Sequence, residues 1–139
     1  MKTLIFLSLL LLTSTADFTY ERLTPENSAL LLVDHQTGLF NGVADQSLPD
    51  FKNNVMALVD AAKMFKIPVI LSTSFQNGPN GPLIPEILEA FPDAPLIQRP
   101  GQINAWDNED FVKAVNETGR KKLIIAGDFC SSFCKSSRI

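Results

Sequence analysis

Ala29-Leu30-Leu31-Leu32-Val33 is a short, continuous apolar run that ends at a carboxylate, Asp34. An apolar run without polar alternation is typical of a strand buried on both faces of a parallel sheet. The segment before it, Thr24-Pro25-Glu26-Asn27, has the composition of a turn. We therefore predict that residues 29–33 form a central strand and that Asp34 stands at its carboxyl end.

Downstream of this strand, apolar residues recur at spacings of three and four, as on one face of a helix. They are Phe51, Val55, Leu58, Val59, Ala62 and Phe65, with Asp50 placed to cap the first turn. Further strands are predicted at 67–73, 96–97 and 123–127, a short helix at 86–91, and a longer helix that begins at Asp107 or Asn108 and stops at Gly119. Alternating strands and helices predict an α/β fold built on a parallel sheet.

The composition indicates one core-forming domain. The chain has 139 residues, 45% of them hydrophobic, and a formal net charge of -3. No cluster of Lys and Arg offers a footprint for phosphates, so a nucleic-acid partner is not expected.

The N-terminus has the pattern of a signal peptide. Lys2 precedes an apolar run, Leu4 to Leu12, and small residues follow at Ser14-Thr15-Ala16. The run is too short for a membrane span, which needs roughly 20 apolar residues. We expect a signal peptide over 1–16, a secreted or secretory-lumen protein and no membrane contact after cleavage; the alternative is a hydrophobic arm that packs on the fold. The sequon Asn116-Glu117-Thr118 is consistent with secretion.

Polar side chains follow each predicted strand, where parallel α/β sheets bind their ligands. They are Asp34, His35 and Gln36, then Ser72, Thr73 and Ser74, then Gln98 and Arg99, and after the fourth strand Asp128 with a tail that holds both cysteines. A thiol beside a cation and a carboxylate can be deprotonated for nucleophilic attack. No set of His, Cys, Asp and Glu has the spacing of metal ligands, so neither a metal nor a cofactor is expected.

Four motifs in order resemble the isochorismatase-like cysteine hydrolases, and within them the YcaC-like branch. They are Leu31-Leu32-Val33-Asp34-His35-Gln36, the loop 77–82, the run from Arg99-Pro100-Gly101 to Asp107-Asn108, and Leu123-Ile124-Ile125-Ala126-Gly127. The resemblance implies a doubly wound, Rossmann-like sheet with helices on both faces, of which this sequence carries the N-terminal four strands or so. It also implies a small-molecule substrate and a homo-oligomer.

The family's catalytic triad is Asp, Lys or Arg, and Cys. The resemblance places the first two members at Asp34, as general base, and at Arg99, which would steady the thiolate and hold a substrate oxygen. It places the nucleophile at position 133, which is Phe133 here; Cys134 stands one residue later and is the candidate nucleophile. Gln36, Asn104 and Trp106 are candidate substrate-binding residues, with Trp106 expected in the pocket wall or the core.

The tail leaves several alternatives open. We expect an incomplete hydrolase domain over 17–127 and a divergent tail over 128–139, a chain truncated or altered after Gly127. Cys130 and Cys134 could form a disulfide, within the chain or between chains, could be free thiols, or Cys134 could reach the nucleophile position. The chain would then be a hydrolase of C–N or related bonds, or else an inactive isoform that acts as a binding or oligomer partner. A small secreted disulfide protein is the third hypothesis.

Overall fold

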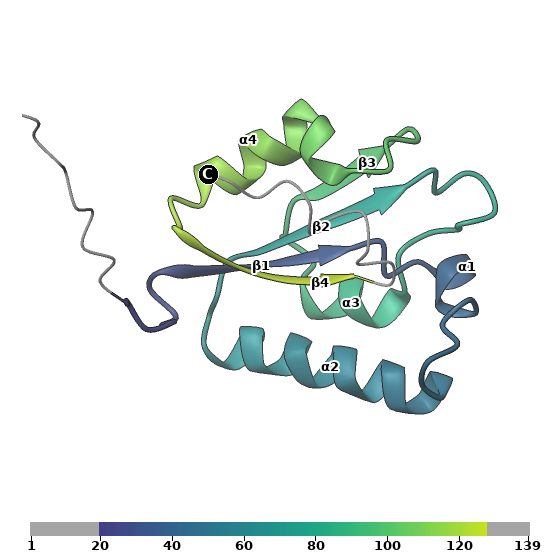
Figure 1. Cartoon of the computed structure of the whole chain (residues 1–139), viewed down its shortest axis with the longest axis horizontal. Coiled ribbons are helices and arrows are strands. Elements are labelled where there is room, and N and C mark those ends of the chain that lie inside the picture. Colours follow the sequence, from purple (N-terminus) through teal and green to yellow (C-terminus); the bar gives the residue numbers. More distant parts are fainter. Residues whose placement is uncertain (1–19, 128–139) are drawn as a thin grey trace, which may run out of the picture.

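The computed structural model describes residues 20–127, which form a parallel sheet covered by helices on both faces (Figure 1). The strands are β1 (Ser28–Val33), β2 (Val69–Ser74), β3 (Leu96–Arg99) and β4 (Lys122–Gly127), in the order β3-β2-β1-β4. The helices are α1 (Thr37–Phe40), α2 (Leu48–Met64), α3 (Pro85–Ala90), α4 (Glu109–Glu117) and the 3-10 turn η1 (Ala105–Asp107). The predicted α/β class, with four parallel strands and helices on both faces, is confirmed.

The apolar run in β1 forms a central strand, as predicted. All six of its residues are buried, because β2 and β4 pair with it on either side and helices cover it above and below. β4 has a similar apolar sequence, yet each of its six residues is only half-buried. Within the described part of the chain, β4 pairs with β1 alone.

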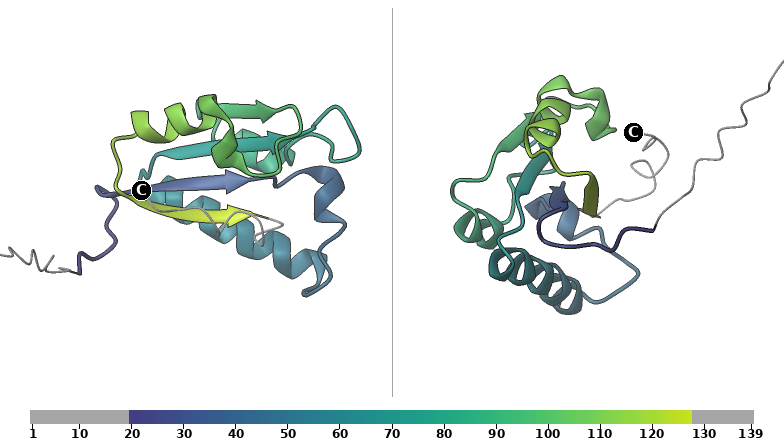
Figure 2. Two further views of the ribbon diagram at one scale, coloured as in Figure 1. Left: turned by 45° about the horizontal axis from the view of Figure 1, so that its top comes forward. Right: turned by 90° about the vertical axis from the view of Figure 1, so that its left-hand side faces the viewer.

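The two faces of the sheet pack against different helices (Figure 2). Leu30 and Leu32 point to the face covered by α2 and α3, where Val59 and Ile87 are buried. Leu31 and Val33 point to the opposite face, where they pack with Phe111 of α4. Alternation along a strand sends successive side chains to opposite faces, so one continuous apolar strand supplies both cores.

The strand order fixes where a ligand site can lie. The chain moves outward from β1 through β2 to β3 and then returns to place β4 on the other side of β1. The connecting helix changes face at this reversal, from α2 and α3 to α4. In open α/β sheets the ligand crevice lies at such a switch point, beyond the carboxyl ends of the strands. Here those ends belong to β1 and β4, and Val33 is the register partner of Gly127.

Helix termini explain the small differences from the predicted boundaries. Helix α2 begins three residues before Phe51, because Ser47 and not Asp50 is its N-cap: the Ser47 hydroxyl accepts from the Asp50 N–H and donates to the Asp50 carboxylate. Asn108 caps α4 by accepting from the N–H of Phe111 at 3.0 Å. Gly119 follows the α4 terminus with φ at 64°, the left-handed conformation that favours glycine there.

Two short elements were not predicted. α1 and η1 are each shorter than five residues, so hydrophobic periodicity cannot reveal them. In addition, β3 extends to Arg99, which makes this residue the last of a strand and not part of a loop. No helix within residues 20–127 is long and apolar enough to cross a bilayer.

Candidate active site at the carboxyl ends of the strands

Asp34 and Arg99, 65 residues apart in sequence, form an ion pair at the carboxyl edge of the sheet. Arg99 Nη2 donates to both carboxylate oxygens of Asp34, at 2.6 Å for Oδ2. The Arg99 side chain is fully buried, and that of Asp34 is 18% exposed. The two residues that the sequence singled out therefore lie together, and of the two side chains only that of Asp34 is in contact with solvent.

The backbone turns sharply at Asp34, which adopts the left-handed region with φ at 62°. The Asp34 N–H still donates to the carbonyl of Ser72 at 2.9 Å, and the Asp34 carbonyl accepts from the N–H of Gln36 at 2.7 Å. Asp and Asn tolerate this region better than most residues, although it remains uncommon. Non-glycine residues in this region cluster at functional sites, and here the turn carries the carboxylate out of the β1 ladder toward Arg99.

Arg99 uses all its donors within the protein. Its Nε donates to the hydroxyl of Ser72 at 3.0 Å, and its Nη1 donates to the carbonyls of Gln102 and of Ile103, at 3.2 Å for Ile103. With the two bonds to Asp34, five donors meet five acceptors, the full capacity of a guanidinium. The expectation that Arg99 also holds a substrate oxygen therefore requires that one of these bonds be given up.

Two opposing effects act on the Asp34 carboxyl group. Burial raises the pKa of Asp34 above its ordinary value, and the hydrogen bonds and charge of Arg99 oppose that rise. A carboxylate with a raised pKa is a better proton acceptor than one in water, as a general base requires.

Gln36 is buried, but its side-chain amide is bonded to backbone. Its Nε2 donates to the carbonyls of Ser74, at 3.0 Å, and of Gly81, and its Oε1 accepts from the Ser74 N–H at 2.8 Å. These bonds tie the start of α1 to the end of β2 and to the loop at Gly81. Gln36 therefore stabilises that loop, and neither N–H of its side-chain amide is free to bind a ligand.

Asn104 and Trp106 are also engaged within the fold. Asn104 accepts from the Trp106 N–H at 3.3 Å and donates to the Asp107 carboxylate at 3.0 Å, so it caps η1. The Trp106 ring packs edge-on against Phe111 at 5.5 Å and belongs to the core beneath α4. Trp106 thus takes the core position that was one of its two predicted places.

Ser72 is the residue at this site that was not selected from the sequence. It was noted only as one of several polar residues at the strand ends, yet it is fully buried and accepts from Arg99. The signal was its position: Ser72 directly follows Leu71 in a strand whose preceding residues are all apolar. Cys130 and Cys134 lie outside the described residues.

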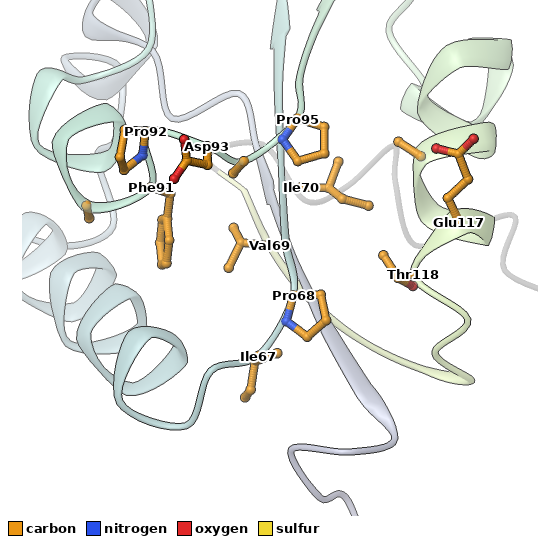
Figure 3. Close-up of a pocket in the computed structure, with 13 residues that line it drawn as sticks. Ile67, Pro68, Val69, Ile70, Phe91, Pro92, Asp93, Pro95, Glu117 and Thr118 are labelled. Carbon is orange, nitrogen blue, oxygen red and sulfur yellow. The ribbon is translucent and has the colours of Figure 1, made fainter.

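An open hollow lies at the other end of the sheet (Figure 3). It is lined by residues 67–70, which lead into β2, by the segment from Ala90 to Pro95 and by the end of α4. Most of these side chains are apolar, and the two carboxylates among them are Asp93, from the segment before β3, and Glu117, from α4 (Figure 3). Within residues 20–127 no three His, Cys, Asp or Glu side chains gather as metal ligands would.

Comparison with known proteins identifies a family and a close relative in sequence. The family model described as "Isochorismatase domain" matches residues 28–135. The Escherichia coli (strain K12) protein named "Probable hydrolase YcaC" is 58% identical over 123 residues, which are 86% of this chain and 59% of that protein. The chain thus spans less than two thirds of the length of this curated relative.

Two solved structures are similar over most of the chain. YcaC from Pseudomonas aeruginosa, with hexane-2,5-diol and covalent acrylamide, has 64% identity and a TM-score of 0.77, and the match covers 79% of this chain and 55% of that one. The E. coli YcaC gene product, an octameric hydrolase of unknown specificity, has 62% identity and a TM-score of 0.76, over 78% and 53% of the two chains. An isochorismatase from Pseudomonas putida, at 24% identity and a TM-score of 0.63, shares the fold.

These relatives correct one expectation. The predicted signal peptide and secretion are not supported, because the matched relative is named as a probable hydrolase, YcaC, and nothing in that match indicates export. The error arose from the run Leu4 to Leu12, since hydropathy does not distinguish a signal segment from another short apolar N-terminal segment. The support drawn from the sequon at Asn116 falls with it. Residues 1–19 lie outside the part of the chain that the structure describes.

Proposed function

Because the chain belongs to the isochorismatase family, we propose that it is a hydrolase that cleaves a C–N or related bond in a small molecule. The observation that carries the proposal is the buried ion pair of Asp34 and Arg99 at the switch point of the sheet. The hydrolase domain would comprise residues 17–127, and the segment 128–139 would supply the nucleophile. The substrate meets the protein at the carboxyl ends of β1 and β4.

The register of the sheet supports Cys134 as the nucleophile. Gly127 is paired with Val33, so the chain that leaves β4 starts beside the residue that precedes Asp34. The family match extends to residue 135 and includes both cysteines. Cys134 is the nearer of the two to the position at which the family carries its cysteine, and it is the residue we assign.

The proposed reaction has two stages. Asp34 takes the proton of the Cys134 thiol, and the thiolate attacks the carbonyl carbon of the substrate. The C–N bond breaks, the amine leaves with the proton that Asp34 had accepted, and the acyl group remains as a thioester on sulfur. Water then attacks the thioester, Asp34 accepting one of its protons; the acid is released and the thiol is restored.

The charges of the described residues at this edge favour an uncharged substrate. Arg99 is the one cation in the segments 34–46, 73–84 and 99–107 that line the carboxyl edge, and its donors are all occupied. A carboxylate on the substrate would find no free cation among these segments. Small neutral amides are therefore the substrate class to test first.

The test uses the full 139-residue chain and a panel of small neutral amides, with release of ammonia as the readout. Asp34→Asn should abolish turnover, since an amide cannot accept the thiol proton. Glu86→Gln removes a carboxylate from the exposed pair with Lys52 and should leave turnover unchanged. Turnover that survives in Asp34→Asn, or none from the unaltered chain with any amide, would contradict the proposal.

A thiol-reactive probe identifies the nucleophile separately. Iodoacetamide should label Cys134 faster than Cys130, and a substrate amide should slow the labelling of Cys134 alone. Comparison of Cys134→Ser with Cys130→Ser makes the assignment specific. Equal labelling of both cysteines, with and without the amide, would remove Cys134 from the mechanism.

A homo-oligomer is the second part of the proposal. The E. coli YcaC gene product, at 62% identity, is an octamer. The half-buried apolar strand β4 supports self-association of this chain as well, because it offers backbone and side chains at an edge of the described sheet. Sedimentation of the full chain tests this self-association. A chain that self-associates but releases no ammonia from any amide would act only as an inactive oligomer partner.

A further inference from the structure

Ser72 is a buried hydroxyl among apolar neighbours. It lies on β2, two residues after Ile70, and on the same face, where Ile70, Leu31 and Val33 pack beneath α4. A buried hydroxyl without a partner costs free energy, so such a position normally carries an apolar residue. Ser72 is fully buried, and the partner that explains it is the Nε of Arg99 at 3.0 Å.

The two sides of the Arg99 guanidinium are fixed from different parts of the chain. Ser72 on β2 holds Nε, and the carbonyls of Gln102 and Ile103, in the turn after β3, hold Nη1. A guanidinium is planar, so contacts at two of its nitrogens determine where the third points. The third, Nη2, meets both oxygens of Asp34.

From this geometry we infer that Ser72 is a positioning residue, which sets the plane of Arg99 and through it holds Asp34 in a bidentate pair. Arg99 is then a clamp on the base and does not bind the substrate. This inference rests on the proposed function only where it names Asp34 as the base. The contacts themselves are independent of any turnover.

The electrostatics of Asp34 provide a readout that does not depend on activity. Burial raises the pKa of Asp34, and Arg99, the one charged group of the described residues that shifts it, opposes the rise through its hydrogen bonds and its charge. Without the Ser72 hydroxyl the guanidinium can turn about its stem, and its bonds to Asp34 weaken. The opposing effect falls, and the pKa of Asp34 rises further.

The experiment is a ¹³C NMR titration of the Asp34 carboxyl group in the full chain. Ser72→Ala should raise the Asp34 pKa above that of the unaltered chain, because Arg99, once released from Ser72, opposes the effect of burial less. Ser72→Thr keeps the hydroxyl and should stay near the unaltered value. Thr73→Val is the matched control: it removes the neighbouring buried hydroxyl, which bonds Gln76 and not Arg99, so the Asp34 pKa should not move.

A merely structural role for Ser72 gives a different result. Ser72→Ala and Thr73→Val would then lower the melting temperature alike and leave the Asp34 pKa where it was, which would overturn the inference. Equal pKa shifts in both variants would overturn it too. A shift found in a chain that hydrolyses no amide would support the clamp and count only against the proposed function.

A second measurement needs no variant and holds if Ser72→Ala fails to fold. In the unaltered chain the Arg99 Nε–H should exchange with solvent far more slowly than the Nε–H of Arg22, which is exposed. Exchange of the two groups at the same rate would show that Ser72 does not hold Arg99, and the inference would fail.

Discussion

Asp34 and His35 are adjacent in sequence and both follow β1, but their side chains lie in opposite electrostatic environments. Asp34 meets Arg99 on the α4 side of the sheet and keeps a charged partner. His35 stacks on Phe51 of α2 at 6.4 Å on the other side, where burial lowers its pKa to about 4. The face beneath α4 thus holds a charged pair, whereas the face above α2 and α3 is kept neutral.

This difference assigns separate tasks to the two faces. The neutral face is apolar packing with one uncharged imidazole, and it supplies stability through the area that it buries. On the charged face, the pair of Asp34 and Arg99 takes the place of some apolar packing and positions a carboxylate where the chain leaves β4. Removing one partner of a buried ion pair leaves an unpaired charge in the interior, which strongly lowers the free energy of unfolding. Truncating an apolar side chain leaves no such charge.

The largest effect is expected from Asp34→Asn. The variant keeps the side-chain shape and a residue type that tolerates the left-handed turn, but leaves the fully buried Arg99 charge without a counter-ion. We expect the free energy of unfolding to fall by about 3 to 5 kcal/mol, measured by urea denaturation. Glu86→Gln, which breaks the exposed pair with Lys52, is the control and should be near neutral. Equal effects of the two variants would mean that the buried pair is not a special feature of the α4 face.

Leu32→Ala tests the neutral face. Leu32 is fully buried beneath α2, and its truncation should lower the free energy of unfolding by about 3 kcal/mol through lost transfer and cavity terms. Because no charge is uncovered, the loss should be the same at pH 6 and pH 8. Leu23→Ala, at an exposed leucine, is the control and should change little. A pH-dependent loss in Leu32→Ala would show that the two faces are coupled.

The pH dependence of stability isolates His35. Its pKa is about 4 in the folded chain against 6.5 unfolded, so the unfolded state takes up a proton that the folded state refuses. The stabilisation is complete above pH 6.5 and is lost as the pH falls toward 4, by at most about 3 kcal/mol.

His35→Gln should flatten this part of the profile, whatever its effect at pH 8. Asp34, with a raised pKa, contributes in the opposite sense, and the comparison of variant with unaltered chain cancels it. Urea midpoints at half-unit intervals between pH 4 and 8 provide the measurement. A variant profile parallel to that of the unaltered chain would contradict the neutral, buried imidazole.

The sequence predicted the parts of this site that topology alone determines. Asp34 follows β1 and Arg99 ends β3, and parallel strands bring their carboxyl ends to one edge, so their meeting required no knowledge of packing. The partners of Arg99 at Gln102 and Ile103 are backbone carbonyls, which leave no trace in residue types. The partners of Gln36 could not be predicted for a related reason: nothing in its residue type reveals that its amide bonds the backbone of Ser74.

Removal of the helix caps should have the smallest effect on the free energy of unfolding, and it compares one helix from each face. Ser47→Ala removes the cap of α2, which has 17 residues, and Asn108→Ala removes the cap of α4, which has nine. Each should cost about 1 kcal/mol in the free energy of unfolding. The loss should be larger for Asn108→Ala, because α4 has fewer helical bonds and fewer buried residues to hold its first turn.

Asn53→Ala, at an exposed position inside α2, should be neutral or slightly stabilising, since Ala is the better helix former there. It serves as the control for both cap variants in thermal melts. A larger loss in the free energy of unfolding for Ser47→Ala would mean that the neutral face depends on the start of α2, beside Phe51 and His35. Apolar packing alone would then not explain the stability of that face.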